Sequence, residues 1–205
     1  MKVLAAIAIG AAAAAAYGEL YELKYDTGSP AVQFAWYTGA GRWVGNEFDV
    51  STLKTRHNII REIKFYTSPY WPNNKYDGFR LAIFDFSAGK PGAKLWPEAE
   101  GRFVKATGTE GFKTFWVNYY ITRTKFVAAV EQFYDYPECD PYFCDTNPTY
   151  LKYAWQKDGA ASWEYLAGHS AYPYRNLILR VIFRTGYSEI NVAPTSLGRV
   201  KALYY

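Results

Sequence analysis

The ten residues Asn176-Leu-Ile-Leu-Arg-Val-Ile-Phe-Arg-Thr185 alternate in character more regularly than any other part of the chain. One set of alternate positions is apolar, with Leu177, Leu179, Val181 and Phe183, and the other set carries Arg180 and Arg184. Successive side chains of a β-strand point to opposite faces of its sheet, so this segment is predicted to be a strand with one buried and one solvent-facing side.

Ten earlier segments are also strand-like, and Gly, Pro and Asn residues separate them. They are Tyr21–Asp26, Val32–Tyr37, Val44–Val50, Ile59–Thr67, Phe79–Phe86, Arg102–Thr107, Phe112–Tyr120, Lys125–Tyr134, Tyr150–Gln156 and Ser162–Leu166. Asp158-Gly159 lies between the last two of these ten, which is typical of a hairpin turn. About ten short strands with turns between them predict an all-β protein, either a sandwich or a barrel.

Composition supports this fold class and excludes others. Aromatic residues make up 20% of the chain, with 20 Tyr, 13 Phe and 7 Trp, and such residues suit a pleated, half-buried surface. The net charge of +4 is small and comes without a Lys/Arg-rich block, which argues against nucleic acid as a partner.

Both ends of the chain differ from its middle. Residues 1–18 combine Lys2, an Ala-rich apolar run and the small residues of Ala16-Tyr17-Gly18, which predicts a secretory signal peptide cleaved before Glu19. A buried Ala-rich helix is the alternative. We therefore expect a secreted or cell-surface protein that does not span the membrane, with one domain over residues 19–187. Residues 188–205 form a tail that is either an edge strand or a surface-attachment segment.

The order of several short motifs resembles an accessory β-sandwich module of secreted bacterial proteins, found beside extracellular peptidases or ahead of C-terminal sorting segments. The motifs include Tyr25-Asp-Thr-Gly-Ser-Pro30, Phe79-Arg-Leu-Ala-Ile-Phe-Asp85, Gly89-Lys-Pro-Gly-Ala-Lys-Leu95, Lys125-Phe-Val-Ala-Ala-Val-Glu-Gln132 and Gly168-His-Ser-Ala-Tyr172. The resemblance covers about Tyr21 to Arg184. It implies an antiparallel, jelly-roll-like sandwich that is exported and is not itself an enzyme.

The loop between residues 135 and 148 holds both cysteines and a group of acids. An even number of cysteines in an exported chain favours a disulfide between Cys139 and Cys144. Asp135, Glu138, Asp140 and Asp145 supply the oxygen donors that calcium takes, so this loop is the candidate calcium site, against the alternative of a solvated acidic loop. No other cofactor is expected.

Aromatic residues in polar loops are the candidate ligand-binding residues, because flat exposed rings stack on sugars. Tyr70, Trp71 and Tyr76 come first, and Trp155 and Trp163, on either side of the Asp158-Gly159 turn, come second. Packing at one end of the sandwich is the alternative for each of them.

No catalytic residues are expected. Gly168-His-Ser-Ala171 lacks the second glycine of a nucleophile elbow, His57 lies in a polar turn, and Glu98 and Glu100 read as a solvated loop. We therefore expect a non-catalytic module for extracellular adhesion, assembly or scaffolding, which contacts other surface proteins or associates with itself through sheet edges. A carbohydrate-binding module that uses exposed loop aromatics is the alternative.

Overall fold

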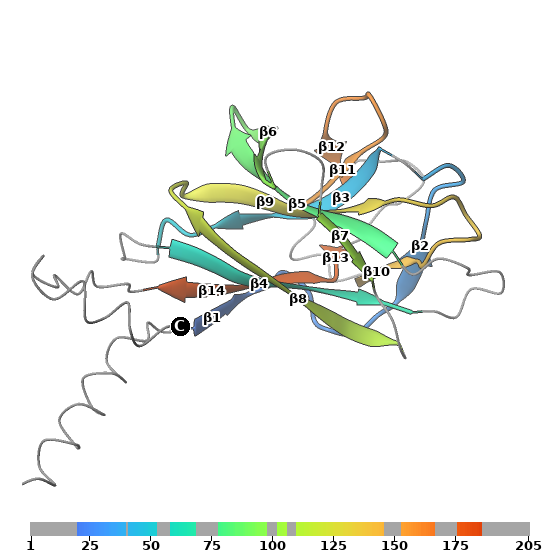
Figure 1. Cartoon of the computed structure of the whole chain (residues 1–205), viewed down its shortest axis with the longest axis horizontal. Helices are drawn as coiled ribbons and strands as arrows, with labels where there is room; N and C mark the ends of the chain where they lie inside the picture. Colours follow the sequence, from blue (N-terminus) through green and yellow to red (C-terminus); the bar gives the residue numbers. More distant parts are fainter. Residues whose placement is uncertain are drawn as a thin grey trace, which may run out of the picture.

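The computed structural model of the chain describes residues 20–39, 41–52, 58–68, 78–97, 102–105, 110–145, 153–166 and 176–185. These residues form 14 β-strands and no α-helix, arranged in two antiparallel sheets that lie one above the other (Figure 1). The predicted antiparallel β-sandwich is confirmed, with more strands than the ten expected. No helix within the described residues has the length and apolar character needed to cross a membrane.

Sheet A, the lower layer in Figure 1, contains seven strands. They are β1 (Leu20–Leu23), β2 (Val32–Phe34), β4 (Asn58–Thr67), β8 (Gly111–Ile121), β10 (Tyr142–Asp145), β13 (Asn176–Leu177) and β14 (Leu179–Thr185). Strand β14 lies between β1 and β4, and β8 pairs with the other side of β4. These four strands therefore lie side by side in the spatial order β8-β4-β14-β1 and form one continuous face.

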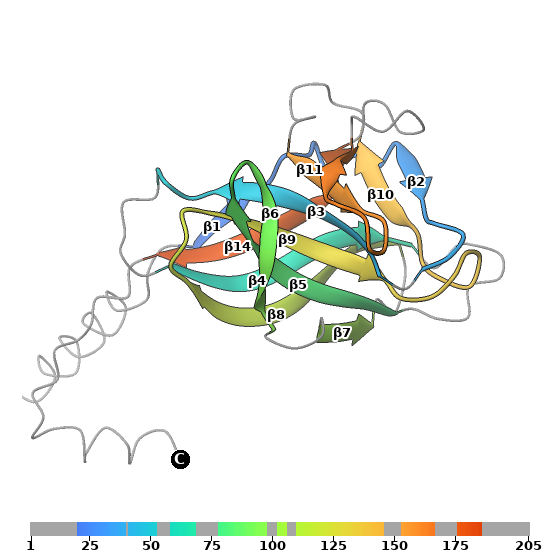
Figure 2. The same cartoon turned by 90° about the horizontal axis from the view of Figure 1, so that it is seen from above.

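Sheet B, the upper layer, also contains seven strands. They are β3 (Arg42–Asp49), β5 (Gly78–Ser87), β6 (Lys90–Trp96), β7 (Arg102–Lys105), β9 (Lys125–Gln132), β11 (Ala154–Lys157) and β12 (Glu164–Tyr165). The order is β12-β11-β3-β9-β5, and both β6 and β7 pair with β5. Strand β6 rises above the outer side of this layer (Figures 1 and 2).

Two segments outside the predicted strands also form strands. In Gly89-Lys-Pro-Gly92, β6 begins at Lys90 and the turn before it is Ala88-Gly89, where both residues have positive φ. Positive φ at both central residues is the geometry of a tight hairpin turn. The acidic loop contains β10, whose four residues are all buried between neighbouring strands.

The core lies between the two sheets and is largely aromatic. Phe65 of β4 meets Phe79 of β5 with ring centroids 4.8 Å apart, so the two sheets touch directly through their inner faces. In β14 the apolar positions are fully buried and Arg180 and Arg184 are partly exposed, as the alternation predicted. Each fully buried large apolar side chain contributes about 1.5–3 kcal/mol relative to an exposed one.

A second apolar cluster covers the outer face of sheet B. Trp43, Phe84 and Trp155 form it together with small residues of β5 and β9, and Trp163 packs on Phe84 at 5.1 Å. Gly45 lies in the same face, where a Cβ atom would come within 2.5 Å of the Ala128 carbonyl oxygen. Side chains thus cover the outer side of sheet B, whereas the described residues form no such cluster on the outer side of sheet A.

Candidate functional site

The first set of predicted ligand-binding aromatics lies outside the described residues. Tyr70, Trp71 and Tyr76 belong to residues 69–77, and His57, His169, Glu98 and Glu100 also fall in undescribed segments. The predictions about these residues, about the signal peptide and about the tail remain predictions.

The second set of predicted aromatics is accounted for by packing. The predicted hairpin is present as β11 and β12, but the Trp155 side chain belongs to the second apolar cluster and the residue is only 3% exposed. Its indole N–H donates to Glu47 Oε2 at 3.3 Å. Trp163 is half-buried against the same cluster. Packing against this cluster thus covers Trp155 and partly covers Trp163.

The four acidic residues of the predicted calcium loop do not converge. Asp145 accepts hydrogen bonds from the Thr27 amide at 2.6 Å and from Asn176 Nδ2 at 2.8 Å, whereas Asp135 accepts from the Gly39 amide at 2.6 Å. Nowhere in the described part of the chain do three His, Cys, Asp or Glu side chains group in a way that could hold a metal ion. The geometry of the described residues gives the calcium prediction, which included Glu138 and Asp140, no support.

The predicted disulfide is not formed, because Cys139 and Cys144 are both free, buried thiols. Cys144 is part of β10 and packs in the core between the sheets, whereas Cys139 precedes that strand. Burial away from water, followed by the nearby Asp140 and Asp135 charges, raises the pKa of the Cys139 thiol to about 12. A thiol held in this state is unreactive at neutral pH.

Strand β8 carries three exposed aromatic rings on the outer face of sheet A. Phe112 is 36% exposed, Trp116 is 52% exposed and Tyr120 is 45% exposed. Their cross-strand neighbours on β4 are Tyr66, Glu62 and Ile59. We call these three residues the β8 aromatic row.

The sequence contained a signal for this row. Phe115-Trp116 and Tyr119-Tyr120 are adjacent aromatic pairs within one predicted strand. Neighbouring side chains of a strand point to opposite faces, so one ring of each pair has to leave the core. Phe115 and Tyr119 indeed pack against the core and their partners face outward.

A groove of about 370 Å³ lies beside the row, on the same face of sheet A. Ile182 of β14 lies between the two flanking strands of the groove. Leu20 and Glu22 of β1 line one side, and Arg61, Glu62 and Lys64 of β4 line the other. Ion pairs join Arg61 to Glu62 at 3.4 Å and Lys64 to Glu22 at 3.5 Å. The groove therefore combines apolar side chains with balanced charges.

A β-bulge connects the groove to the row. Arg61 has no partner residue in either ladder of β4, because the pairing steps directly from Ile60 to Glu62. Two consecutive side chains, Arg61 and Glu62, consequently line the same groove, which regular alternation would forbid. The Arg61 guanidinium lies 4.5 Å from the centre of the Trp116 ring. On β8, Asn118 next to this irregularity has a φ of 51°.

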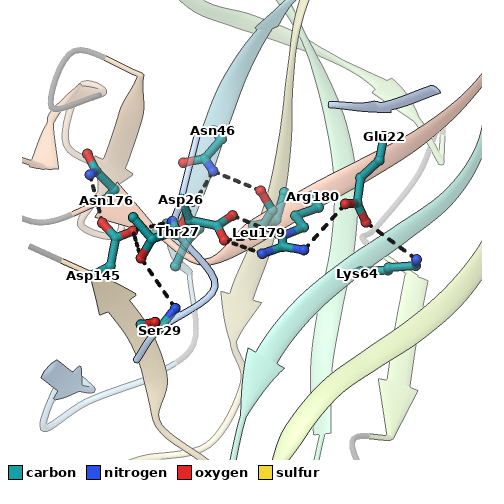
Figure 3. A network of polar contacts seen from close by, with 11 residues as sticks. Glu22, Asp26, Thr27, Ser29, Asn46, Lys64, Asp145, Asn176, Leu179 and Arg180 are labelled. Carbon is teal, nitrogen blue, oxygen red and sulfur yellow. Dashed lines mark hydrogen bonds and ion pairs between the residues drawn. The ribbon is translucent and has the colours of Figure 1, made fainter. Parts of the chain in front are cut away.

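A partly buried ion-pair network adjoins the groove, with which it shares Glu22 and Lys64 (Figure 3). Arg180 donates to Asp26 through Nη2 at 2.6 Å and through Nε at 3.1 Å, and to Glu22 through Nη1 at 3.3 Å. Partial burial lowers the pKa of Arg180, but the contacts with Asp26 and Glu22 outweigh it, so the pKa is raised. Glu22 also contacts Lys64, so the network links β1 to both β14 and β4.

No family model matches the chain, and no curated protein sequence matches it. Solved structures that share its fold include two of one protease. One is an alanine variant of the clostridial cysteine protease Cwp84 after propeptide cleavage, with a TM-score of 0.57 and 13% identity over 82% of this chain and 40% of that chain. The other holds the cysteine protease and lectin-like domains of Cwp84, a surface layer associated protein of Clostridium difficile, with a TM-score of 0.52 and 14% identity over 72% and 33% of the two chains. The chain thus spans less than half of either neighbour, and likeness at such identity is likeness of fold.

Proposed function

We propose that this chain is an extracellular, non-catalytic accessory module that binds carbohydrate on the outer face of sheet A. The observation that carries the proposal is Trp116, a 52% exposed indole held beside a groove of paired carboxylates and cations. An exposed ring provides a stacking platform for the apolar face of a sugar. Carboxylate and guanidinium groups beside it are strong hydrogen-bond partners for hydroxyl groups.

The described lining of the groove does not form a hydrolytic site. Its described lining contains no Ser, Thr, Cys or His, and both of its carboxylates, Glu22 and Glu62, are engaged in ion pairs. Glycoside hydrolysis needs one protonated and one free carboxyl group across the bond that breaks. Binding without chemistry is the use that suits this set of side chains.

The fold comparison supports the same class of function. The neighbouring structures belong to a surface layer associated protease, one of them including a domain described as lectin-like. This chain matches two fifths or less of each neighbour, which suits an accessory unit of a larger assembly. The predicted signal peptide would place the module outside the cell.

A glycan array followed by calorimetric titration tests the proposal, with Trp116→Ala as the critical variant. Removing a central aromatic anchor is expected to weaken the dissociation constant at least about tenfold. Tyr37→Ala is the matched control, because Tyr37 is 83% exposed but contacts Tyr136 rather than the groove. Equal binding by the Trp116→Ala variant would show that the ligand site lies elsewhere.

An absence of glycan binding together with self-association would favour adhesion or assembly instead. Sedimentation at micromolar concentrations measures that association directly. Hydrolysis of any glycan by the purified chain would contradict the non-catalytic part of the proposal.

A further inference from the structure

The β8 aromatic row extends well beyond one sugar-sized site. Phe112, Trp116 and Tyr120 are four residues apart along one strand. Their partners on β4, Tyr66, Glu62 and Ile59, are four and three residues apart, because β8 is irregular at Asn118. At about 3.3 Å per residue the three positions lie roughly 13 Å and roughly 10 Å apart, and the row is roughly 23 Å long. A single sugar ring cannot touch two of these side chains at once.

Two of the three rings carry the same accessory group. The Arg61 guanidinium lies 4.5 Å from the centre of the Trp116 ring, and the Arg180 guanidinium lies 4.3 Å from the centre of the Phe112 ring. A cation over one face of an aromatic ring restrains that ring. The row is thus a repeated arrangement on one strand, which suits a ligand with a repeated structure.

Charge on this face argues for an uncharged ligand. The groove is lined by two cations and two carboxylates. Arg61 pairs with Glu62, and Lys64 pairs with Glu22. Arg180 is neutralised by buried Asp26. An anionic or cationic polymer would have to displace existing ion pairs, whereas hydroxyl groups can add hydrogen bonds to them.

We infer that sheet A binds an internal stretch of an uncharged, unbranched glycan chain that runs along β8, with the three rings as successive contacts. This inference rests on the proposed function and deepens it, because it names the ligand class and the direction of the chain. Arg61 and Glu62, which line the groove, flank Trp116 at the middle of the row, and Phe112 and Tyr120 extend the contact on either side.

Calorimetric titration with cello-, chito-, manno- and xylo-oligosaccharides of two, four and six sugar units tests the inference. For the series that binds, affinity is expected to rise at least about tenfold from the disaccharide to the hexasaccharide, and to be insensitive to added NaCl. Phe112→Ala and Tyr120→Ala are each expected to weaken hexasaccharide binding about fivefold and to leave disaccharide binding within about twofold. Trp116→Ala weakens both, and Tyr37→Ala weakens neither.

The possible failures can be told apart. The inference is overturned if affinity does not depend on the length of the glycan, or if both outer variants bind the hexasaccharide as the unchanged protein does. The proposed function still holds in either case if binding depends on Trp116. Stronger binding of a charged polysaccharide, with a steep salt dependence, overturns the uncharged ligand. If none of the oligosaccharide series binds, both the proposed function and the inference are overturned. Both are also overturned if the protein is a dimer in solution and the Trp116→Ala substitution dissociates that dimer. Near-ultraviolet circular dichroism confirms that each variant is folded.

Discussion

The Arg180–Asp26 ion pair is expected to be the most sensitive polar contact of the described fold. The Asp26 side chain is fully buried and that of Arg180 is 12% exposed, and the two share hydrogen bonds of 2.6 to 3.2 Å. The Arg180→Gln substitution removes the cation and leaves the Asp26 carboxylate buried. Loss of one partner of a buried pair costs about 3–5 kcal/mol.

Urea denaturation followed by fluorescence measures this loss as a change in the free energy of unfolding. For a domain of this size the same loss corresponds to a fall in melting temperature of about 6–20 °C. Arg123→Gln is the control, because Arg123 pairs with Asp85 at 3.3 Å on the surface with its own side chain 57% exposed. Exposed pairs contribute about 0–1 kcal/mol.

A second substitution separates the charge from the packing. Asp26→Asn in the Arg180→Gln background removes the unpaired charge, so the double variant is expected to recover at least about 2 kcal/mol relative to the sum of the single changes. The reasoning is refuted if Arg180→Gln costs no more than Arg123→Gln. It is also refuted if the two single changes simply add.

Two further predictions concern stability. Gly45→Ala places a Cβ atom within 2.5 Å of the Ala128 carbonyl and is expected to cost about 1–3 kcal/mol in urea denaturation. Gly92→Ala, whose closest contact would be the Ser87 hydroxyl at 3.2 Å, should cost less, and equal costs would contradict the close-packing argument. The pKa of Cys139 is raised from 9.0 to about 12, so between about pH 9 and pH 12 the unfolded thiol loses its proton while the folded one keeps it. Stability is therefore expected to fall as pH rises through this range, by at most about 4 kcal/mol, and Cys139→Ala should flatten the curve of unfolding free energy against pH. A curve of unchanged slope in Cys139→Ala would show that other groups, such as Tyr25 with a pKa of about 12, cause the decline.

Periodicity predicted the parts of the fold that depend on burial alone. The alternation in β14 gave the inner and outer faces of that strand, because a strand at the centre of a sheet has to bury one side. Periodicity did not predict strand β10, because this short strand has no alternating pattern. The four residues of β10 are all buried, so they resemble a loop with scattered apolar residues until their neighbours are known.

The candidate site was predicted less well, for a reason that Trp155 and Trp116 illustrate. Both are tryptophans in strands, and the sequence around Trp155 is the more polar and turn-like of the two. Trp155 is nevertheless covered, because β12 pairs with its strand and Tyr165 packs on it with ring centroids 4.0 Å apart. Trp116 lies on a strand whose outer face has no such cover among the described residues, and it is half exposed.

Alternation with a period of two and frequent turns were enough to predict an all-β protein, because such a pattern buries one face of each strand, but they left a sandwich and a barrel open. Which rings face solvent, and what lies beside them, depends on how the two sheets are assembled. The bulge at Arg61 places two consecutive side chains in one groove, and Arg180 beside that groove pairs with Asp26, a residue 154 positions away. Such long-range placements depend on the register between strands, and register is fixed only when all the strands are packed together.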